Sequence, residues 1–420
     1  MRYSMINEAA ARKLDSEDVL AHVRERFVIP DGTIYLDGNS LGLLTHAAQE
    51  RVQQTVTQEW GQDLITSWNA HQWIDLPLRV GDRIGQLIGA ATGQVVCCDS
   101  ISVNLTKALV AALSVQTARG QRRHKVISTV DNFPTDLYMV QGLQDLLGKG
   151  NCELQLVEEK ELNSTLTDDV SILMVTEVNF RTGRRLPIAE LTRLAHENNI
   201  LVIVDLAHSA GAMPVCLDEW QVDFAVGCTY KYLNGGPGAP AFVYAAERHH
   251  ATMQQPLRGW MGHAKPFEFS NDYQPAAGIR QFLAGTPPVT AMVAVEGALT
   301  AFDHVDLKDV RDKSLRLARL FHDLLHDAGL TQMLQCIAPE QEAQRGSQLA
   351  YAFEHAYGLC QALIERGVIA DFRAPNYIRF GFTPLYTSYH EIWLAVQIIR
   401  DVIATEDHLD PRWQQRNAVT

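Results

Sequence analysis

The sequence has few cysteines and none of the spacings that cysteine-based sites use. Its 420 residues include seven cysteines, an odd number that contains no C-x-x-C pair. Scattered cysteines of this kind predict reduced thiols in a cytoplasmic protein rather than a disulfide framework. They also argue against a zinc site, and we expect no bound metal.

The sequence also lacks long apolar runs and an excess of basic residues. Its apolar runs break within a few residues, well short of a membrane span, and the first 20 residues mix both charge signs without the apolar core of a secretion signal. The net charge of −13 argues against a general nucleic-acid-binding protein. We therefore expect a soluble protein with neither a membrane nor a nucleic acid as a partner.

The length and the 46% hydrophobic content predict a globular protein with a large domain and a smaller one. Between residues 95 and 204, short apolar segments alternate with segments of helical periodicity. Strands are expected at 125–129, 153–157, 171–176 and 200–204, with helices at 135–147 and 188–198. Such alternation predicts an α/β fold in which helices cover both faces of a mostly parallel sheet.

The two ends of the chain show a different pattern of expected helices and strands from residues 95–204. After Pro287 and Pro288, residues 290–328 predict one long, nearly uninterrupted helix, and the remainder mixes strands with helices. We expect residues 306–420 to form a small α+β domain and residues 1–60 to pack with it. Residues 61–305 would then form the large domain. The expected elements at the two ends are helices at 47–60, 78–88, 356–365 and 390–403 and strands at 348–353 and 377–382.

The segment from residue 200 to residue 238 carries the strongest chemical signal. An apolar run ends on Asp205, with His208 shortly after, and a second apolar run leads into Tyr230 and Lys231 before a glycine-rich turn. Side chains at the carboxyl ends of buried strands lie where open α/β sheets bind ligands. A lysine that can form a Schiff base, together with an acid that can face a pyridinium nitrogen, is typical of a pyridoxal 5'-phosphate enzyme.

Each of these residues also has an ordinary structural interpretation. Most lysines are solvated surface charges, and Asp205 could be the N-cap of a helix. An Asp205–His208 metal pair is a further alternative, although no other ligands cluster nearby in the sequence.

Two more segments could complete a phosphate-binding site. Residues 100–104 place Ser100 and Ser102 before a helix expected at 105–117, and free N–H groups at a helix start can bind phosphate. Residues 131–136 follow a strand and open a helix with Pro134, so that Phe133 could stack on an aromatic ring. A serine cap and a core phenylalanine are the ordinary alternatives.

Five strings together resemble the kynureninase family, which belongs to the fold-type I pyridoxal phosphate enzymes, in the class V aminotransferase branch. They are F-P-T-D at residue 133, V-D-L-A-H-S at 204, C-T-Y-K-Y-L-N-G-G-P-G at 228, R-G-W-M-G-H at 258 and F-L-A-G-T-P-P at 282. The similarity runs from L-D-G-N-S-L-G-L at residue 36 to N-Y-I-R-F-G-F at 376. The Y-K-Y-L-N-x-G and W-x-G-H strings are highly specific, whereas V-D-x-A-H and the lysine are shared by the whole branch.

The resemblance implies a role for each matching residue. Lys231 would carry pyridoxal 5'-phosphate as a Schiff base, Asp205 would face its ring nitrogen, and Tyr230 would be a catalytic acid. Phe133 would stack on the ring. The other cofactor-binding residues implied are Ile101, Ser102, Pro134, Thr135, Asp136, Thr176 and His208.

The remaining implied residues bind substrate or come from a second subunit. Arg379 would bind the substrate α-carboxylate, with Ser40, Trp68 and His263 as further substrate contacts. Trp260 and Thr286 match positions that reach the cofactor of a neighbouring subunit. The resemblance therefore implies a homodimer with shared active sites.

The implied reaction is the hydrolytic Cβ–Cγ cleavage of L-kynurenine to anthranilate and L-alanine. 3-Hydroxykynurenine is an alternative substrate, although Trp68 and Thr286 favour the ring without a hydroxyl. The role could be tryptophan catabolism or pyridine nucleotide biosynthesis. The rival activities are an aminotransferase and a cysteine desulfurase that would use Cys336, and a cofactor-binding regulator is the non-enzymatic rival. Two features argue against a cysteine desulfurase: Thr229 and Tyr230 precede the lysine, and Phe133 stands where desulfurases use a histidine.

Overall fold

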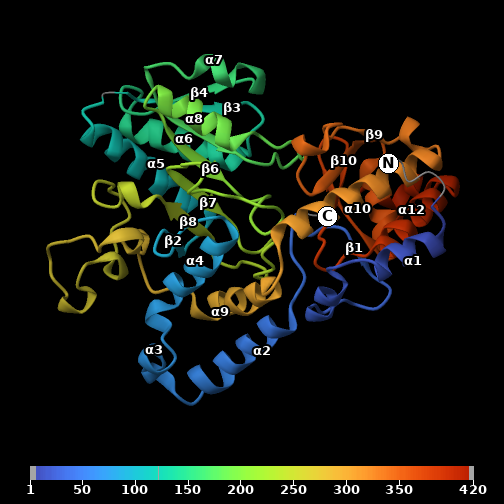
Figure 1. Cartoon of the computed structure of the whole chain (residues 1–420), viewed down its shortest axis with the longest axis horizontal. Helices are drawn as coiled ribbons and strands as arrows, with labels where there is room; N and C mark the ends of the chain where they lie inside the picture. Colours follow the sequence, from blue (N-terminus) through green and yellow to red (C-terminus); the bar gives the residue numbers. More distant parts are fainter. Residues whose placement is uncertain (1–5, 122, 416–420) are drawn as a thin grey trace.

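The computed structural model describes residues 6–121 and 123–415. In these residues a large sheet and a small sheet each have their own helices, and a third sheet has only two strands (Figure 1). The large sheet has seven strands, and β8 is antiparallel to both neighbours whereas the other strands are all parallel to one another. Their spatial order is β2 (Val95–Cys97), β8 (Phe242–Ala245), β7 (Phe224–Gly227), β6 (Leu201–Asp205), β5 (Val170–Thr176), β3 (Lys125–Thr129) and β4 (Glu153–Val157).

Both faces of the large sheet are buried under helices, as the sequence predicts. On β6, Val202 and Val204 belong to one hydrophobic core, whereas Leu201 and Ile203 belong to the core on the opposite face. Because successive side chains of a strand point to opposite faces, a strand buried on both sides must be apolar throughout. The covering helices are α4 (Leu76–Leu87), α5 (Ile101–Ala118), α6 (Pro134–Leu147), α7 (Leu162–Thr165), α8 (Ile188–Glu197) and α9 (Val289–Ala298).

The small sheet consists of four antiparallel strands in the order β12 (Asp371–Arg373), β13 (Tyr377–Gly381), β10 (Gln348–Ala352) and β9 (Gln335–Cys336). It packs with α10 (Leu307–Asp327), α11 (Ala356–Glu365) and α12 (Tyr389–Ala404) around a third core. The start of the chain joins this core: α1 (Glu8–Ser16) contacts α12, and β1 (Ile34–Tyr35) pairs in parallel with β11 (Val368–Ile369). The boundaries at residues 60 and 305 stay predictions.

Two expectations from the sequence are wrong at their edges. The stretch 290–328 is divided, because α9 and a short 3₁₀ turn end at Phe302 and α10 begins at Leu307. His304 adopts a left-handed conformation with φ of 63°, and the Asp306 side chain caps the new helix by accepting from the Lys308 N–H at 2.8 Å. The helix expected at 105–117 starts four residues earlier, so Ile101 and Ser102 lie within its first turn.

Within the described residues, one helix is long and apolar enough to cross a membrane by length and composition, namely α5. Half of its residues are buried in the protein, including Asn104, Lys107 and Gln116. Buried polar side chains with partners inside the fold mark it as a core helix of the large sheet.

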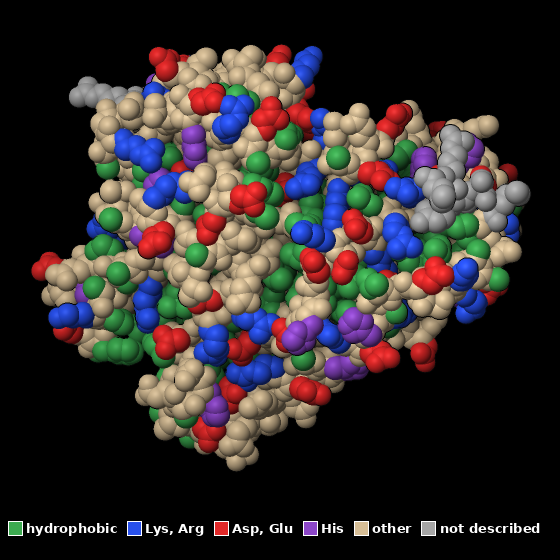
Figure 2. All heavy atoms as spheres, in the orientation of Figure 1, with side chains coloured by type: hydrophobic (Ala, Val, Ile, Leu, Met, Phe, Trp, Pro, Cys, Tyr) green, Lys and Arg blue, Asp and Glu red, His purple; other side chains and the backbone are tan. Residues whose placement is uncertain are grey.

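On the face shown in Figure 2, basic and acidic side chains are interspersed.

Helices α2 (His46–Gln54) and α3 (Ser67–Ala70) lie away from both sheets, at the bottom of Figure 1. A π-helical turn, Thr55–Trp60, continues α2, and α2 packs along α9. The side chains exposed along the π-helical turn and the next turn include Trp60, Leu64 and Ile65. An apolar surface of this kind is typical of a protein–protein contact.

Candidate active site

The carboxyl ends of β3, β5, β6 and β7 meet the start of α5 around a cavity of about 280 Å³. Parallel strands place their carboxyl ends at one edge of the sheet, which is why segments far apart in the sequence meet here. Ten of the residues singled out from the sequence line this cavity: Ile101, Ser102, Phe133, Thr135, Asp136, Thr176, Asp205, His208, Tyr230 and Lys231.

Lys231 is held inside the cavity by the turn that follows β7. Its Nζ lies 2.9 Å from Nε2 of His208, and its side chain is half-buried. The turn is fixed from the other side, because the Gly42 N–H donates to the Tyr230 carbonyl at 2.8 Å. A side chain at the Gly42 position would collide with the Lys231 carbonyl, so the close approach requires glycine there.

Asp205 and Asp136 form a buried pair of carboxyl groups. Asp205 is the last residue of β6, and its Oδ1 accepts from the Ala207 N–H at 2.8 Å. Because turns and not a helix follow β6, Asp205 does not cap a helix. Burial raises the pKa of Asp205 to about 6 against the opposing effect of the Lys231 ammonium. Burial and the Asp205 charge raise the pKa of Asp136 well above its usual range. Two adjacent carboxyl groups in a buried site oppose each other's ionisation.

The opposite end of the cavity is the first turn of α5. Ser100 is the N-cap of this 18-residue helix and accepts from the Val103 N–H at 3.4 Å. The next two residues, Ile101 and Ser102, line the cavity. The backbone N–H groups of a helix's first turn have no partner within the helix. The positive end of the helix dipole and these donors suit an anionic group such as a phosphate.

The residues between these two ends fit an aromatic cofactor with a ring nitrogen. The Phe133 ring is 42% exposed and makes an edge-on contact with Phe180 at 5.2 Å between centroids. Oδ1 of Asp136 and Nδ1 of His208 are buried without a hydrogen-bond partner. Burial, followed by the positive charges of Lys231 and Arg379, lowers the pKa of His208 well below its usual range. A bound cofactor would supply the partners that these buried atoms lack.

Arg379 and Ser40 meet next to the cavity rather than on its wall. The Arg379 guanidinium donates from Nη1 to the carbonyl of Phe180, a cavity residue, and from Nη2 to Ser40 Oγ at 3.3 Å. Its main partner is Asp371, which accepts from Nε at 2.7 Å and also from Nη2. Asp371 could not be predicted from the sequence, because nothing in the neighbouring residues distinguishes it from a surface carboxylate.

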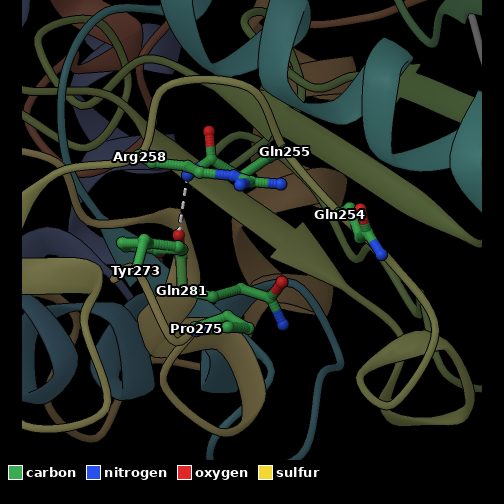
Figure 3. A pocket seen from close by; sticks show the side chains of 6 residues that line it. All are labelled: Gln254, Gln255, Arg258, Tyr273, Pro275 and Gln281. Atoms are coloured by element: carbon green, nitrogen blue, oxygen red, sulfur yellow. Dashed lines mark hydrogen bonds between the residues drawn. The ribbon is translucent and has the colours of Figure 1, made fainter. Parts of the chain in front are cut away.

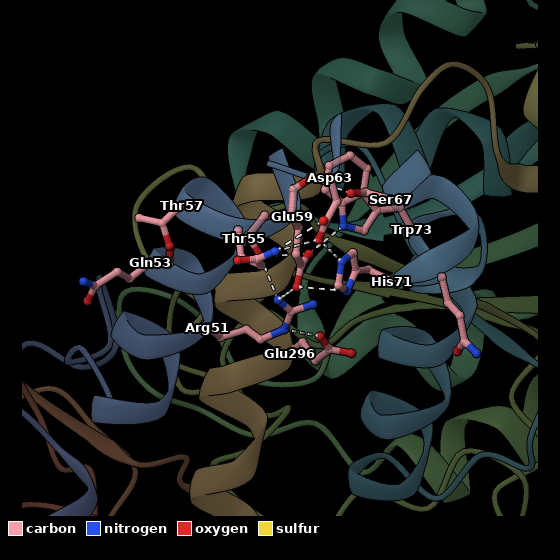
Figure 4. Close-up of polar contacts among 12 residues, drawn as sticks. Arg51, Gln53, Thr55, Thr57, Glu59, Asp63, Ser67, His71, Trp73 and Glu296 are labelled. Atoms are coloured by element: carbon pink, nitrogen blue, oxygen red, sulfur yellow. Dashed lines mark hydrogen bonds and ion pairs between the residues drawn. The ribbon is translucent and has the colours of Figure 1, made fainter. Parts of the chain in front are cut away.

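Besides Arg379 and Ser40, five more predicted residues do not line this cavity: Pro134, Trp68, Trp260, His263 and Thr286. Pro134 occupies the first turn of α6, a position for which its ring is suited. Trp68 lies on α3 and makes an edge-on contact with Trp73 at 6.1 Å. Figure 4 shows how this region is fixed: Trp73 donates from Nε1 to the Glu59 carboxylate at 2.8 Å, and Ser67 Oγ donates to the Glu59 carbonyl.

The last three lie on the segment between β8 and α9. His263 is buried and pairs with the Asp272 carbonyl at 3.2 Å, whereas Thr286 is exposed. Trp260 is 37% exposed and contacts the ring of Phe267. This segment encloses a small cavity of about 110 Å³ of its own (Figure 3), which is lined by Gln254, Gln255, Arg258, Tyr273, Pro275 and Gln281.

Several cavity residues were not found from the sequence. Phe180, Ala207, Cys228, Ala239 and Ala241 complete the lining, and Asn132 supports it by accepting from the Thr176 hydroxyl. Phe180 lies just after the end of β5, and Asp205 lies at the end of β6. The position of Phe180 after a strand was therefore the signal from which it could have been predicted. The small alanines carry no chemical signal of their own.

The amino-acid sequence is similar to known proteins over nearly its full length. Residues 310–399 match a family model described as the kynureninase C-terminal domain. A kynureninase of Burkholderia pseudomallei (strain 1106a) is 46% identical over 411 residues, which is 98% of this chain and 99% of that protein. A kynureninase of Pseudomonas fluorescens is 45% identical over 408 residues, covering 97% and 98% of the two chains. The chain belongs to the kynureninase family.

Solved structures with the same fold are more distant in sequence. A cysteine desulfurase from Thermococcus onnurineus superimposes with a TM-score of 0.76 at 18% identity, covering 91% of this chain and 98% of that one. A cysteine desulfurase from Escherichia coli gives a TM-score of 0.76 at 20% identity, with 92% and 98% covered. At this identity the likeness concerns the fold alone. The family resemblance, the fold-type I architecture and the class of pyridoxal phosphate-dependent hydrolase are thereby confirmed.

Proposed function

We propose that this protein hydrolyses L-kynurenine at the Cβ–Cγ bond to give anthranilate and L-alanine. The observation that carries the proposal is the meeting of Lys231, His208 and the Asp205–Asp136 pair in one cavity of a chain related to kynureninases over nearly its full length. The alternative substrate, 3-hydroxykynurenine, has one more hydroxyl on its ring. Trp68 and Thr286 favour the ring without this hydroxyl, which a comparison of kcat/KM for the two substrates would test.

The cavity residues divide the binding of pyridoxal 5'-phosphate among them. Asp205 would pair with the ring nitrogen, Phe133 would stack on the ring, and the first turn of α5 with Ile101 and Ser102 would hold the phosphate. Lys231 would hold the aldehyde carbon. When bound, the cofactor withdraws electrons from the substrate carbons next to the amino group.

The protein's own groups would then move protons. Nζ of Lys231 would accept the Cα proton of the substrate, and Nε2 of the neutral His208, 2.9 Å away, can relay it. Burial raises the pKa of Tyr230, so its phenol stays protonated and can donate to the substrate Cβ as the carbon–carbon bond breaks. Water adds to the ketone carbon, which leaves as the carboxyl group of anthranilate.

Substrate recognition would come from Arg379 and from a second subunit. Arg379 would bind the α-carboxylate beside Ser40. Trp68, Trp260, His263 and Thr286 would complete the site of a neighbouring copy in a homodimer, which is supported by the exposed side chains of Trp60, Ile65, Phe267 and Phe269 on the same segments. The seven free cysteines support a reducing location such as the cytoplasm.

The deciding experiment mixes the purified protein with L-kynurenine and follows the fluorescence of anthranilate. We expect turnover by the wild type and none by Lys231→Ala, which should also lose the visible absorbance band of the bound cofactor. Wild-type protein that binds the cofactor but releases no anthranilate would refute the proposal.

The rival activities make different predictions. A cysteine desulfurase would need a reactive thiol, but Cys336 is on the edge strand β9 of the small sheet, and burial raises its pKa. Cys336→Ala should therefore retain full activity. An aminotransferase would accumulate the pyridoxamine form of the cofactor when an amino donor is added alone, and we expect no such accumulation.

A further inference from the structure

Asp371 and Arg379 form a buried pair whose geometry is set by the small sheet. The two residues are directly opposite each other in the β12–β13 register, and their side chains are 1% and 2% exposed. Asp371 Oδ1 accepts from Arg379 Nε at 2.7 Å, and its Oδ2 accepts from Nη2. This two-point contact occupies one edge of the planar guanidinium group.

The other edge of Arg379 contacts Phe180, a residue that lines the active-site cavity. Nη1 donates to the carbonyl of Phe180, which lines the cavity, and Nη2 lies 3.3 Å from Ser40 Oγ. Both acceptors on this edge are neutral, so the charge of the guanidinium is met by a carboxylate on one side only. A carboxylate ligand arriving from the cavity could replace them with two charge-assisted hydrogen bonds.

Asp371 is itself held in place by two further contacts. Ser40 Oγ donates to its Oδ2 at 2.8 Å, and Arg373 pairs with the same oxygen at 2.8 Å. Although burial opposes ionisation, the hydrogen bonds and charge of Arg379 lower the pKa of Asp371. The carboxylate therefore stays ionised and keeps Arg379 in one orientation.

We propose that Asp371 is a positioning residue for substrate recognition: it fixes one edge of Arg379 so that the opposite edge is presented to the substrate α-carboxylate. This inference rests on the proposed role of Arg379. Because the two carboxylates use opposite edges, Asp371 does not compete with the substrate. It acts before binding, since a guanidinium group that is already oriented loses less conformational freedom when the substrate arrives.

The test compares L-kynurenine with L-kynurenine amide, which lacks the carboxylate, in wild type and variants. Asp371→Asn should raise KM for L-kynurenine about ten-fold with a smaller change in kcat, and should leave kcat/KM for the amide within about two-fold. The preference for acid over amide would then fall about ten-fold. Glu391→Gln, which breaks the Arg24 ion pair at the start of α12, is the matched control and should leave the preference unchanged.

The outcomes separate this inference from the function on which it rests. If Arg379→Lys leaves the preference for acid over amide unchanged, the proposed role of Arg379 fails. If Arg379→Lys reduces the preference and Asp371→Asn does not, Asp371 is only structural and the inference is overturned. Should Asp371→Asn fold poorly, Asp371→Glu keeps the charge but moves it, and an unchanged acid preference in that variant would equally overturn the inference. Titration of the cofactor absorbance with L-alanine and with L-alaninamide repeats the comparison without turnover.

Discussion

Replacing Asp37 by asparagine should stabilise the protein relative to wild type more at pH 8 than at pH 5. Asp37 follows β1, and its Oδ1 is buried without a hydrogen-bond partner. Burial and then the Asp371 charge raise its pKa to about 7 from the usual 3.8, while Ser40, Arg379 and Arg373 oppose the shift. The contribution of the neutral form to stability is complete below about pH 4 and is lost as the pH rises through about 7.

The size of the effect follows from this shift in pKa. A shift of about three units corresponds to about 4 kcal/mol between the two protonation states, of which about 2–3 kcal/mol falls between pH 5 and pH 8. An asparagine side chain is neutral throughout, so it avoids this loss. Urea unfolding followed by tryptophan fluorescence at both pH values would measure the difference. The exposed Asp145→Asn on α6 is the control and should show no comparable change.

An unfolding difference between Asp37→Asn and wild type that is the same at pH 5 and pH 8 would refute the reasoning. Substrate binding offers an independent check, because an ionised Asp37 adds negative charge near Arg379. The KM of the wild type for L-kynurenine should therefore rise above about pH 7 more steeply than that of Asp37→Asn. Other groups titrate in both proteins, so only the difference between the two profiles reports on Asp37.

Two further predictions concern a buried lysine on α5 and the second subunit. The ammonium of Lys107 is fully buried on α5, where it pairs with Asp99 and donates to the Phe282 carbonyl at 2.6 Å. Lys107→Met should therefore lower the free energy of unfolding by about 3 kcal/mol, measured by urea unfolding. An unchanged midpoint of the urea unfolding curve would contradict this. Mixing inactive Lys231→Ala with an impaired Trp68→Ala under conditions of subunit exchange should restore up to about a quarter of the wild-type sites, because one site of each mixed dimer is intact. No recovery despite demonstrated exchange would place Trp68 in its own subunit's site.

Several strands of the large sheet can be predicted closely from the sequence because turn-forming residues lie near their ends. The strands at 125–129 and 153–157 match β3 and β4 residue for residue, and the segment ending on Asp205 matches β6 to within one residue. β6 is an apolar run, and turn-forming residues lie close to the other two strands, at 131–132 after β3 and at 150–151 before β4. The boundaries of these strands are therefore marked by nearby residues in the sequence. The break between α9 and α10 is not, since it depends on a left-handed residue and a cap in an otherwise helical pattern.

The contacts of Arg379 show what local patterns cannot supply. Its pairing with Asp371 depends on the register of β12 against β13, and β12 has only three residues. Its contact with Ser40 joins residues 339 positions apart. Neither contact produces a periodic pattern of residues that could be recognised in the sequence. The family resemblance pointed to Arg379 and Ser40, but Asp371 emerged only when the strands were placed side by side.

The distribution of charge explains why such a cavity would select an amino acid with a free carboxylate. Around Arg379 there are two guanidinium groups, Arg379 and Arg373, and one ionised acid, Asp371, while Asp37 is held neutral by burial below about pH 7. One positive charge is therefore left without a balancing carboxylate beside the cavity. A neutral amide would leave this charge to the solvent that reaches Arg373, whereas an α-carboxylate would pair with it directly. Ionising Asp37 would balance this charge, so the carboxyl group that we expect to make stability depend on pH should also weaken substrate binding above about pH 7.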